Sequence, residues 1–247
     1  MSLLLPQSKM SDVILGNLSL LPVINRFGIR LGAAEKSIQQ LCSEQQLEVE
    51  FVLAILNTHL YEDYFPEKKI LSFRLPDMLD YLTKTNNYYI KYLIPNIEHH
   101  LIPLLHSCGP ETKTPGAVHA LFARVKKHLT ERVETENSVL FPALLKRSLR
   151  LASSGASETD SPNCNEDEPA ILAKTFCPNP KSDAEAPEET LFDLKNILIR
   201  HISGTFNDNL AHATVFSLDS LEEDLRQQNR IRSRIFCPMV ARIIETE

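Results

Sequence analysis

The sequence predicts an all-α protein, and three observations support this fold class. Only seven glycines occur in the 247 residues. No long run of alternating β-branched residues is present, whereas apolar residues recur at spacings of three and four, as they do in amphipathic helices. With 43% hydrophobic residues, a chain of this length can bury a genuine core, so we expect it to fold without stabilising crosslinks.

The first part of the chain, residues 1–65, predicts a small domain of short helices. Three short helices are expected, and their end signals are Ser11-Asp12, Pro22, Gly28 and Ser37. A fourth helix is predicted from about Glu48 to Leu60, with its apolar residues on one side. The break at Tyr64-Phe65-Pro66 then marks a domain boundary.

The second part, residues 76–247, predicts a bundle of long helices. Apolar periodicity favours helices at about 76–106, 117–150, 188–203 and 218–245. Pro95 and Pro103 predict a kink or a short break in the first of them. Residues 152–189 are rich in Ser, Asp, Glu, Pro and Asn, which indicates a long, partly disordered loop. Four long amphipathic segments favour a four-helix bundle.

Composition argues against several classes of function. The net charge of −6 and the pI near 5.8 disfavour direct binding of nucleic acid, which needs a concentrated excess of Lys and Arg. No apolar stretch is long enough for a signal peptide or a membrane span, so we expect a cytoplasmic protein. The five cysteines form no C-x-x-C pair and are expected to be structural thiols. No catalytic triad, Gly-rich phosphate loop or paired-carboxylate spacing is found.

Short stretches in both parts carry a resemblance to a known family. In the N-terminal part they are Arg26-Phe27-Gly28-Ile29, Ser37-Ile38-Gln39-Gln40-Leu41-Cys42 and Val52-Leu53-Ala54-Ile55-Leu56-Asn57. In the second part they are Leu140-Phe141-Pro142 and Phe236-Cys237-Pro238. Through them the chain resembles the repair of iron centres family, whose members join a small helical domain to a hemerythrin-like di-iron bundle. The resemblance implies the same architecture here.

The resemblance also points to positions that hold metal ligands in the family. At the place of the family's N-terminal Cys-Cys pair, this chain has Gly32 and Ala33. In the bundle, the positions that correspond to metal ligands hold Asn87, Arg132, Glu136, Gln228 and Arg232. Of these residues, Glu136 alone keeps the family's ligand type. For the third helix the equivalence is open, because neither Glu189 nor His201 has the expected context.

Two readings of the arginines remain open at this point. A guanidinium repels a metal ion, so Arg132 and Arg232 are expected to pair with Glu136 inside the bundle and to fill the volume of the lost metal. Alternatively, both arginines face solvent, and Arg132 and Glu136 form an ordinary i,i+4 pair worth about 0.3–0.5 kcal/mol. Helical phase favours burial, since Leu129, Arg132 and Glu136 share one side of the helix.

A relocated metal site is the alternative to a lost one. His106, His128 and Glu136 are the residues that could hold iron in such a site. We expect no cofactor, and iron is the cofactor that this alternative implies. A lone histidine on a helix is more often a surface residue.

The function expected from the sequence is a non-catalytic sensor or protein-interaction module, with a regulatory role and a degenerate di-iron site. The arrangement is also similar to the N-terminal region of Bacteroides-type LuxR regulators, which implies action through a protein partner rather than on DNA. Tyr88, Tyr89 and Tyr92 could form an aromatic face for a homodimer, and this point stays open. The alternative function is a divergent iron-binding protein that assists iron–sulfur cluster repair under oxidative or nitrosative stress.

Overall fold

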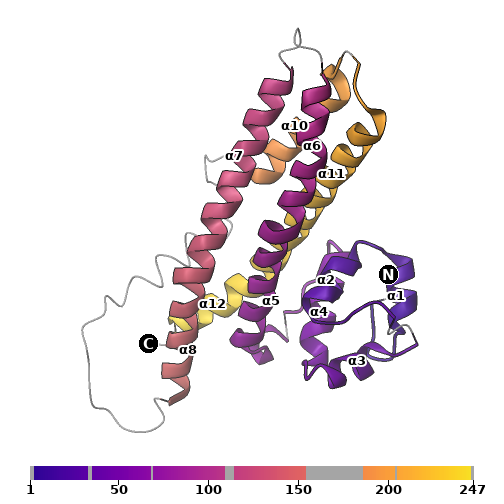
Figure 1. Ribbon diagram of the computed structural model, residues 1–247. Helices are drawn as coiled ribbons and strands as arrows, with labels where there is room; N and C mark the ends of the chain where they lie inside the picture. The colour runs from indigo at the N-terminus through magenta and orange to yellow at the C-terminus, as the bar shows by residue number, and fades with distance from the viewer. Residues whose placement is uncertain are drawn as a thin grey trace, which may run out of the picture. The chain divides into compact units, whose positions relative to one another are not determined.

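A computed structural model shows the protein to be all-α, which confirms the predicted fold class (Figure 1). The structure describes residues 3–32, 35–67, 69–108, 114–153, 186–203 and 205–245. Within these ranges no strand occurs, and the extended backbone forms one isolated bridge between Lys9 and Ser37. No helix in the described ranges is long and apolar enough to cross a membrane.

The chain divides into two compact units, each described here by itself. Unit 1 contains residues 1–84, 144–178 and 227–247, and unit 2 contains residues 85–143 and 179–226. The division does not follow the boundary expected between residues 65 and 76. Unit 1 therefore combines the N-terminal part of the chain with two later segments. The predicted division into residues 1–65 and 76–247 stays a prediction.

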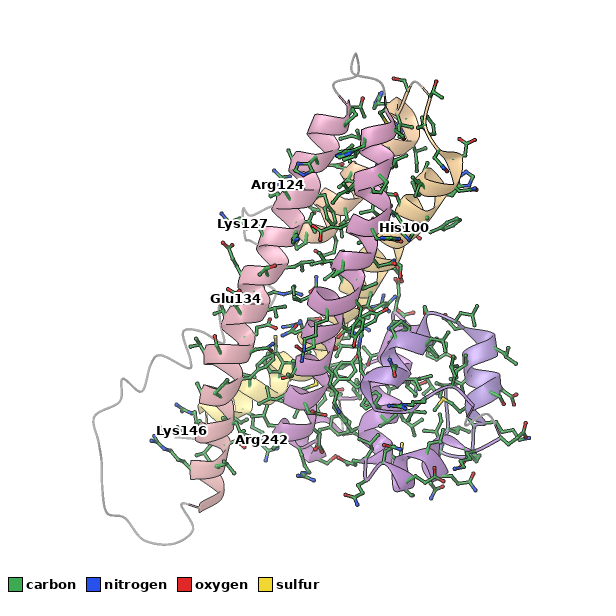
Figure 2. All side chains as sticks on the ribbon, viewed as in Figure 1. His100, Arg124, Lys127, Glu134, Lys146 and Arg242 are labelled. Carbon is green, nitrogen blue, oxygen red and sulfur yellow. The ribbon has the colours of Figure 1, made fainter. Side chains whose placement is uncertain are left out.

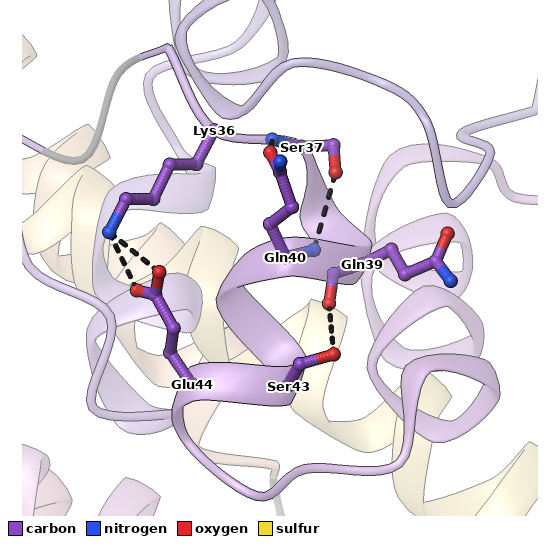
Figure 3. Close-up of polar contacts among 6 residues, drawn as sticks. All are labelled: Lys36, Ser37, Gln39, Gln40, Ser43 and Glu44. Atoms are coloured by element: carbon purple, nitrogen blue, oxygen red, sulfur yellow. Dashed lines mark hydrogen bonds and ion pairs between the residues drawn. The ribbon is translucent and has the colours of Figure 1, made fainter.

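Four short helices open unit 1: α1 (Met10–Gly16), α2 (Leu20–Arg26), α3 (Ile38–Glu44) and α4 (Val49–Leu60). The expected cap at Ser37 is present as a capping box, in which Gln40 N–H donates to Ser37 Oγ and Ser37 N–H donates to Gln40 Oε1 (Figure 3). Gly28 follows α2 with φ +79°, a conformation that glycine adopts without strain. The expected cap at Ser11-Asp12 is wrong, because α1 begins at Met10.

An N-terminal segment before α1 is held by hydrogen bonds to the side chain of Asn57 and to main-chain groups. Asn57, buried on α4, accepts a hydrogen bond from Leu4 N–H at 2.9 Å and donates one to the Leu4 carbonyl at 3.3 Å. Ile38 N–H donates to the Ser8 carbonyl, and Met10 N–H donates to the Lys36 carbonyl. One buried side-chain amide therefore satisfies both backbone polar groups of Leu4.

A three-residue 3-10 turn, η1 (Ile70–Ser72), precedes the later helices. These helices occur near the predicted segments, and their bounds are α5 (Leu75–Tyr88), α6 (Ile94–Ser107), α7 (Thr114–Thr135), α8 (Phe141–Ser153), α10 (Pro187–His201), α11 (Asp208–Ile231) and α12 (Cys237–Glu245). α11 begins ten residues before the predicted start at Leu218. The predicted loop at 152–189 falls mostly outside the described residues.

Three of these helices widen into π-helical segments at the same distance before a proline. The segments are η2 (Tyr89–Leu93) before Pro95, η3 (Glu136–Leu140) before Pro142, and η4 (Arg232–Phe236) before Pro238. A proline lacks an N–H and its ring collides with the carbonyl four residues earlier, and a wider turn relieves that collision. The predicted kink or short break near Pro95 is represented by the π-helical segment η2 within a continuous helical run, and α6 also continues through Pro103.

Unit 2 contains one continuous apolar core to which four helices contribute. Its buried members come from η2 with α6, from α7, from α10 and from α11, and they include Ile97, Val125, Leu194 and Leu221. α7 packs along α10 and also contacts α6. This shared core is compatible with a four-helix bundle.

The cysteines differ from the expectation that all are thiols. Cys42 and Cys108 are free, but Cys237 belongs to a disulfide. Cys164 and Cys177 lie outside the described residues.

Candidate functional site

Glu136 is a carboxylate with no solvent exposure, in the first turn of the π-helical segment η3. Asn86 on α5 donates a hydrogen bond from Nδ2 to Glu136 Oε2 at 2.8 Å. The same amide nitrogen lies 3.1 Å from Asn137 Oδ1. Asn86 is itself fully buried. Two residues far apart in the sequence thus meet in the interior of unit 2, where an amide partly compensates a buried charge.

Arg132 supplies the positive charge that this carboxylate needs. Its Nε lies 3.9 Å from Glu136 Oε1, and the exposed fractions of the two side chains are 16% and 0%. The pair has the i,i+4 spacing of an ordinary surface pair, but it is largely removed from water. Its contribution to stability is therefore governed by desolvation, and loss of one partner is expected to cost far more than for an exposed pair.

The amide that contacts Glu136 is not the one expected from the sequence. Counting back from Pro95 predicts Asn87, but Asn87 is only half-buried and its neighbour Asn86 points inward. Asn86 and Tyr89 are both fully buried and are three residues apart, which places them on one face of the helix. Asn87 lies about 100° away from that face.

Gln228 and Arg232, the residues expected from the fourth helix, are both buried in unit 1. Gln228 donates from Nε2 to the hydroxyl of Tyr81 at 2.8 Å, and Arg26 donates from Nη1 to the same oxygen at 3.4 Å. Tyr81 stacks on Phe27 with ring centroids 5.1 Å apart. This polar cluster joins α2, α5 and α11. The pairing of Arg232 with Glu136 stays a prediction.

The relocated metal site predicted at His106, His128 and Glu136 is not assembled. His106 lies exposed near the end of α6, and Glu136 is buried in η3. Within the described ranges, no three His, Cys, Asp or Glu side chains lie close enough to hold a metal ion together. His128 is exposed overall, yet desolvation of part of its ring and the positive charge of Arg132 lower its pKa.

Sequence reasoning did not identify Glu188 as an inward-facing carboxylate on the third bundle helix. It is buried at the start of α10, whereas the residues considered there, Glu189 and His201, are exposed. The negative charge of Glu188 acts on His128 of α7. The sequence signal for this orientation is Pro187. Proline is favoured at the first position of a helix, so it predicts where α10 begins and thereby which side of the helix Glu188 occupies.

The residues around Glu136 do not fit a di-iron centre. Such a centre needs several carboxylates and imidazoles that converge from facing helices. Glu136 has instead a guanidinium at 3.9 Å and a side-chain amide at 2.8 Å. A guanidinium cannot lose its proton near neutral pH, so it competes with a metal for the carboxylate rather than assisting its coordination.

The other positions singled out from the sequence, the Gly32-Ala33 pair and the three tyrosines, do not form a polar site among the described residues. Gly32 lies in an exposed turn with φ +96°, and Ala33 falls outside the described ranges. The expected aromatic face is incomplete, because Tyr89 is fully buried. Tyr88 and Tyr92 remain, with ring centroids 6.1 Å apart, and Tyr92 is well exposed.

No protein-family model, curated protein or solved structure matches the chain.

Proposed function

We propose that the chain is a non-catalytic protein-interaction module with a regulatory role, built on a helical bundle whose centre depends on protein charge pairs. The observation that supports this proposal is the environment of Glu136. Its carboxylate is satisfied by Asn86 and Arg132, both of which occupy the volume around it. A bundle stabilised in this way keeps its shape without a redox metal, and a fixed shape is what a binding partner recognises.

The most direct test is metal content together with thermal stability. The protein is expressed with iron supplied, purified without chelators, and analysed by elemental mass spectrometry and calorimetry with and without Fe²⁺ under anaerobic conditions. We expect substoichiometric iron and an unchanged Tm. A ligand present at 100 times its Kd stabilises by about 2.7 kcal/mol, which for a chain of this size is a shift of roughly 5–10 °C. Two irons in each chain, or a shift of that size, would overturn the proposal.

One observation favours the alternative of a divergent iron-binding protein for iron–sulfur cluster repair. The lowered pKa of His128 keeps its imidazole neutral near pH 7, which is the form that binds metals, and Glu188 on the facing helix adds a negative charge. Iron bound in this way would be mononuclear. In the same experiment, one iron per chain that is lost in both His128→Gln and Glu188→Gln would support the alternative.

The nature of the partner is a further part of the proposal. We expect another protein rather than nucleic acid, because the net charge is −6, and a second copy of this chain is one form that the partner can take. The exposed Tyr92 is the residue to test for self-association. Sedimentation velocity of the native protein and of Tyr92→Ser over a hundredfold concentration range would show whether it contributes.

A further inference from the structure

Two neighbouring helices of unit 2 carry large apolar side chains on their solvent side. Phe192 and Ile199 of α10 are 50% and 67% exposed, and Phe216 of α11 is 73% exposed. In a helix that packs on a bundle core, such outward positions are normally polar. Single exposed apolar residues are common on protein surfaces and need no explanation, but a group of large ones marks a binding surface.

An ion-pair network shows how α10 lies against α11. Lys195 of α10 contacts Asp219 and lies 2.8 Å from Glu222 Oε2, and both carboxylates belong to α11. The side chains of Lys195 and Glu222 are largely buried. Only residues 202–207 separate the two helices, so they run in opposite directions as antiparallel neighbours.

Helical phase then places the three apolar side chains near one another. Phe192 and Ile199 are three residues before and four residues after Lys195, so they share the side of α10 that faces α11. Phe216 is three residues before Asp219 and lies on the same side of α11 as this contact. Because the helices are antiparallel, Ile199 and Phe216 both lie one turn from the contact, at the same level. We call these three residues the α10–α11 face.

Acidic residues dominate the two helices that form this face. Residues 187–201 and 208–226 contain eight Asp and Glu and three Lys and Arg. Two of the three cations, Lys195 and Arg226, pair with carboxylates of α11. By contrast, α7 of the same unit contains four Lys and Arg and two Glu. Asp193 is exposed and directly follows the first apolar residue of the face. The face therefore combines hydrocarbon with an excess of negative charge.

We propose that the α10–α11 face binds a basic amphipathic helix of another protein. Its apolar residues cover Ile199 and Phe216, and its Lys and Arg lie beside the acidic residues. An acidic face repels a second copy of itself and an anionic membrane, so a cationic partner has the complementary charge. Phe192 and Ile199 are two turns apart, about 10 Å, which matches apolar residues at i and i+7 of a bound helix. The inference rests on the proposed function and adds the chemistry of the partner.

The test is fluorescence anisotropy of labelled designed peptides titrated with the full chain. Two peptides of about 18 residues have Leu at i, i+3, i+4 and i+7, with Lys at the other positions in one and Glu in the other. The Lys peptide should bind at least tenfold more tightly than the Glu peptide at low salt, and severalfold more weakly at high salt. A Lys peptide with scrambled Leu positions should bind at least tenfold more weakly. No saturable binding of the Lys peptide, or equal affinity for any of the other two, would overturn the proposal.

Two pairs of variants locate the binding. Phe216→Ser should weaken binding of the Lys peptide at least tenfold, whereas Ile102→Ser, which changes an exposed apolar residue of α6, should stay within twofold. Asp193→Lys should weaken the Lys peptide at least threefold and tighten the Glu peptide. Its matched control is Glu134→Lys on α7, which should change neither more than twofold (Figure 2). All four residues are exposed, and circular dichroism confirms folding. Equal effects within either pair would show that the face is wrongly assigned.

Failure of this inference is separable from failure of the proposed function. Metal content of the same preparation tests that function, so iron-free protein that binds no Lys peptide rejects the α10–α11 face alone. Two irons in each chain would overturn the proposed function and this inference with it. Sedimentation velocity covers the remaining occupant: self-association that Phe216→Ser abolishes, without peptide binding, would replace the partner helix by a second copy of the chain.

Discussion

Substitution of Glu136 by alanine removes the carboxylate that accepts from Asn86 and pairs with Arg132. A hydrogen bond to a charged group contributes about 1.5–3 kcal/mol, and the amide of Asn86 loses such a bond. Arg132, with a side chain 16% exposed, loses its paired charge as well. Removal of one partner of a buried pair costs about 3–5 kcal/mol in measured cases, and we expect Glu136→Ala to lie in that range.

The assay is urea denaturation followed by far-ultraviolet circular dichroism, with calorimetry as a second probe. For a chain of this size, 1 kcal/mol corresponds to about 2–4 °C, so the expected loss in Tm is roughly 6–20 °C. Because the protein has two units, hydrogen exchange is used to show that the loss falls on η3 and α5. Coincident transitions by both probes justify the use of a single free energy.

Two controls isolate the role of the buried charge. Glu134→Ala changes an exposed glutamate two residues earlier on α7 and should cost less than about 0.5 kcal/mol (Figure 2). Arg132→Leu combined with Glu136→Leu should be more stable than Glu136→Leu alone, because no charge is then left buried without its partner. A loss below about 1 kcal/mol for Glu136→Ala would refute the reasoning.

Three further predictions follow from the described contacts. The lowered pKa of His128 means that its imidazole binds a proton more tightly in the unfolded chain than in the folded one. His128 therefore contributes stability above pH 6.5 that is lost as the pH falls. Between pH 7.5 and 5.0, the Tm of His128→Gln should fall less steeply than the Tm of the native protein. Burial raises the pKa of the Cys42 thiol to about 11; burial also raises the pKa of the Cys108 thiol, but this residue is only half-buried. Iodoacetamide at pH 8 should therefore label Cys108 first. Faster labelling of Cys42 would contradict its burial. Asn57→Ala removes both bonds to Leu4 and should lower the free energy of unfolding by about 1–3 kcal/mol; limited proteolysis should then cleave before Met10, whereas an unchanged digestion pattern would show that the segment is held by other contacts.

Much of the fold follows from local sequence signals. The capping box at Ser37 and the left-handed Gly28 depend on residues within one turn, so the sequence predicts them correctly. The start of α11 lies ten residues before the predicted one, although a local signal is present: Asn207 precedes the helix, and its Oδ1 accepts a hydrogen bond from Leu210 N–H as an N-cap does. The cytoplasmic location expected from composition stays a prediction.

The candidate site was predicted less completely, because it depends on helical phase and on contacts between distant segments. Glu136 and its neighbour Arg132 follow from an i,i+4 spacing and were found. Asn86 was missed in favour of Asn87 because a count of residues from Pro95 does not determine which side of a helix faces the core. Tyr81 and Arg26 meet Gln228 only through tertiary packing, which no local pattern reveals.

The π-helical segments η2, η3 and η4 each hold one more residue per turn than a regular α-helix would at that place. A one-residue deletion inside any of them would restore regular winding, and every side chain on one side of the deletion would then rotate by about 100° about the helix axis. Glu136 and Arg232 begin two of these segments. Deletion of one residue at either place would turn the buried charged side chain away from the core and bring a neighbouring side chain to its position. Length changes there are expected to be far more disruptive than point substitutions.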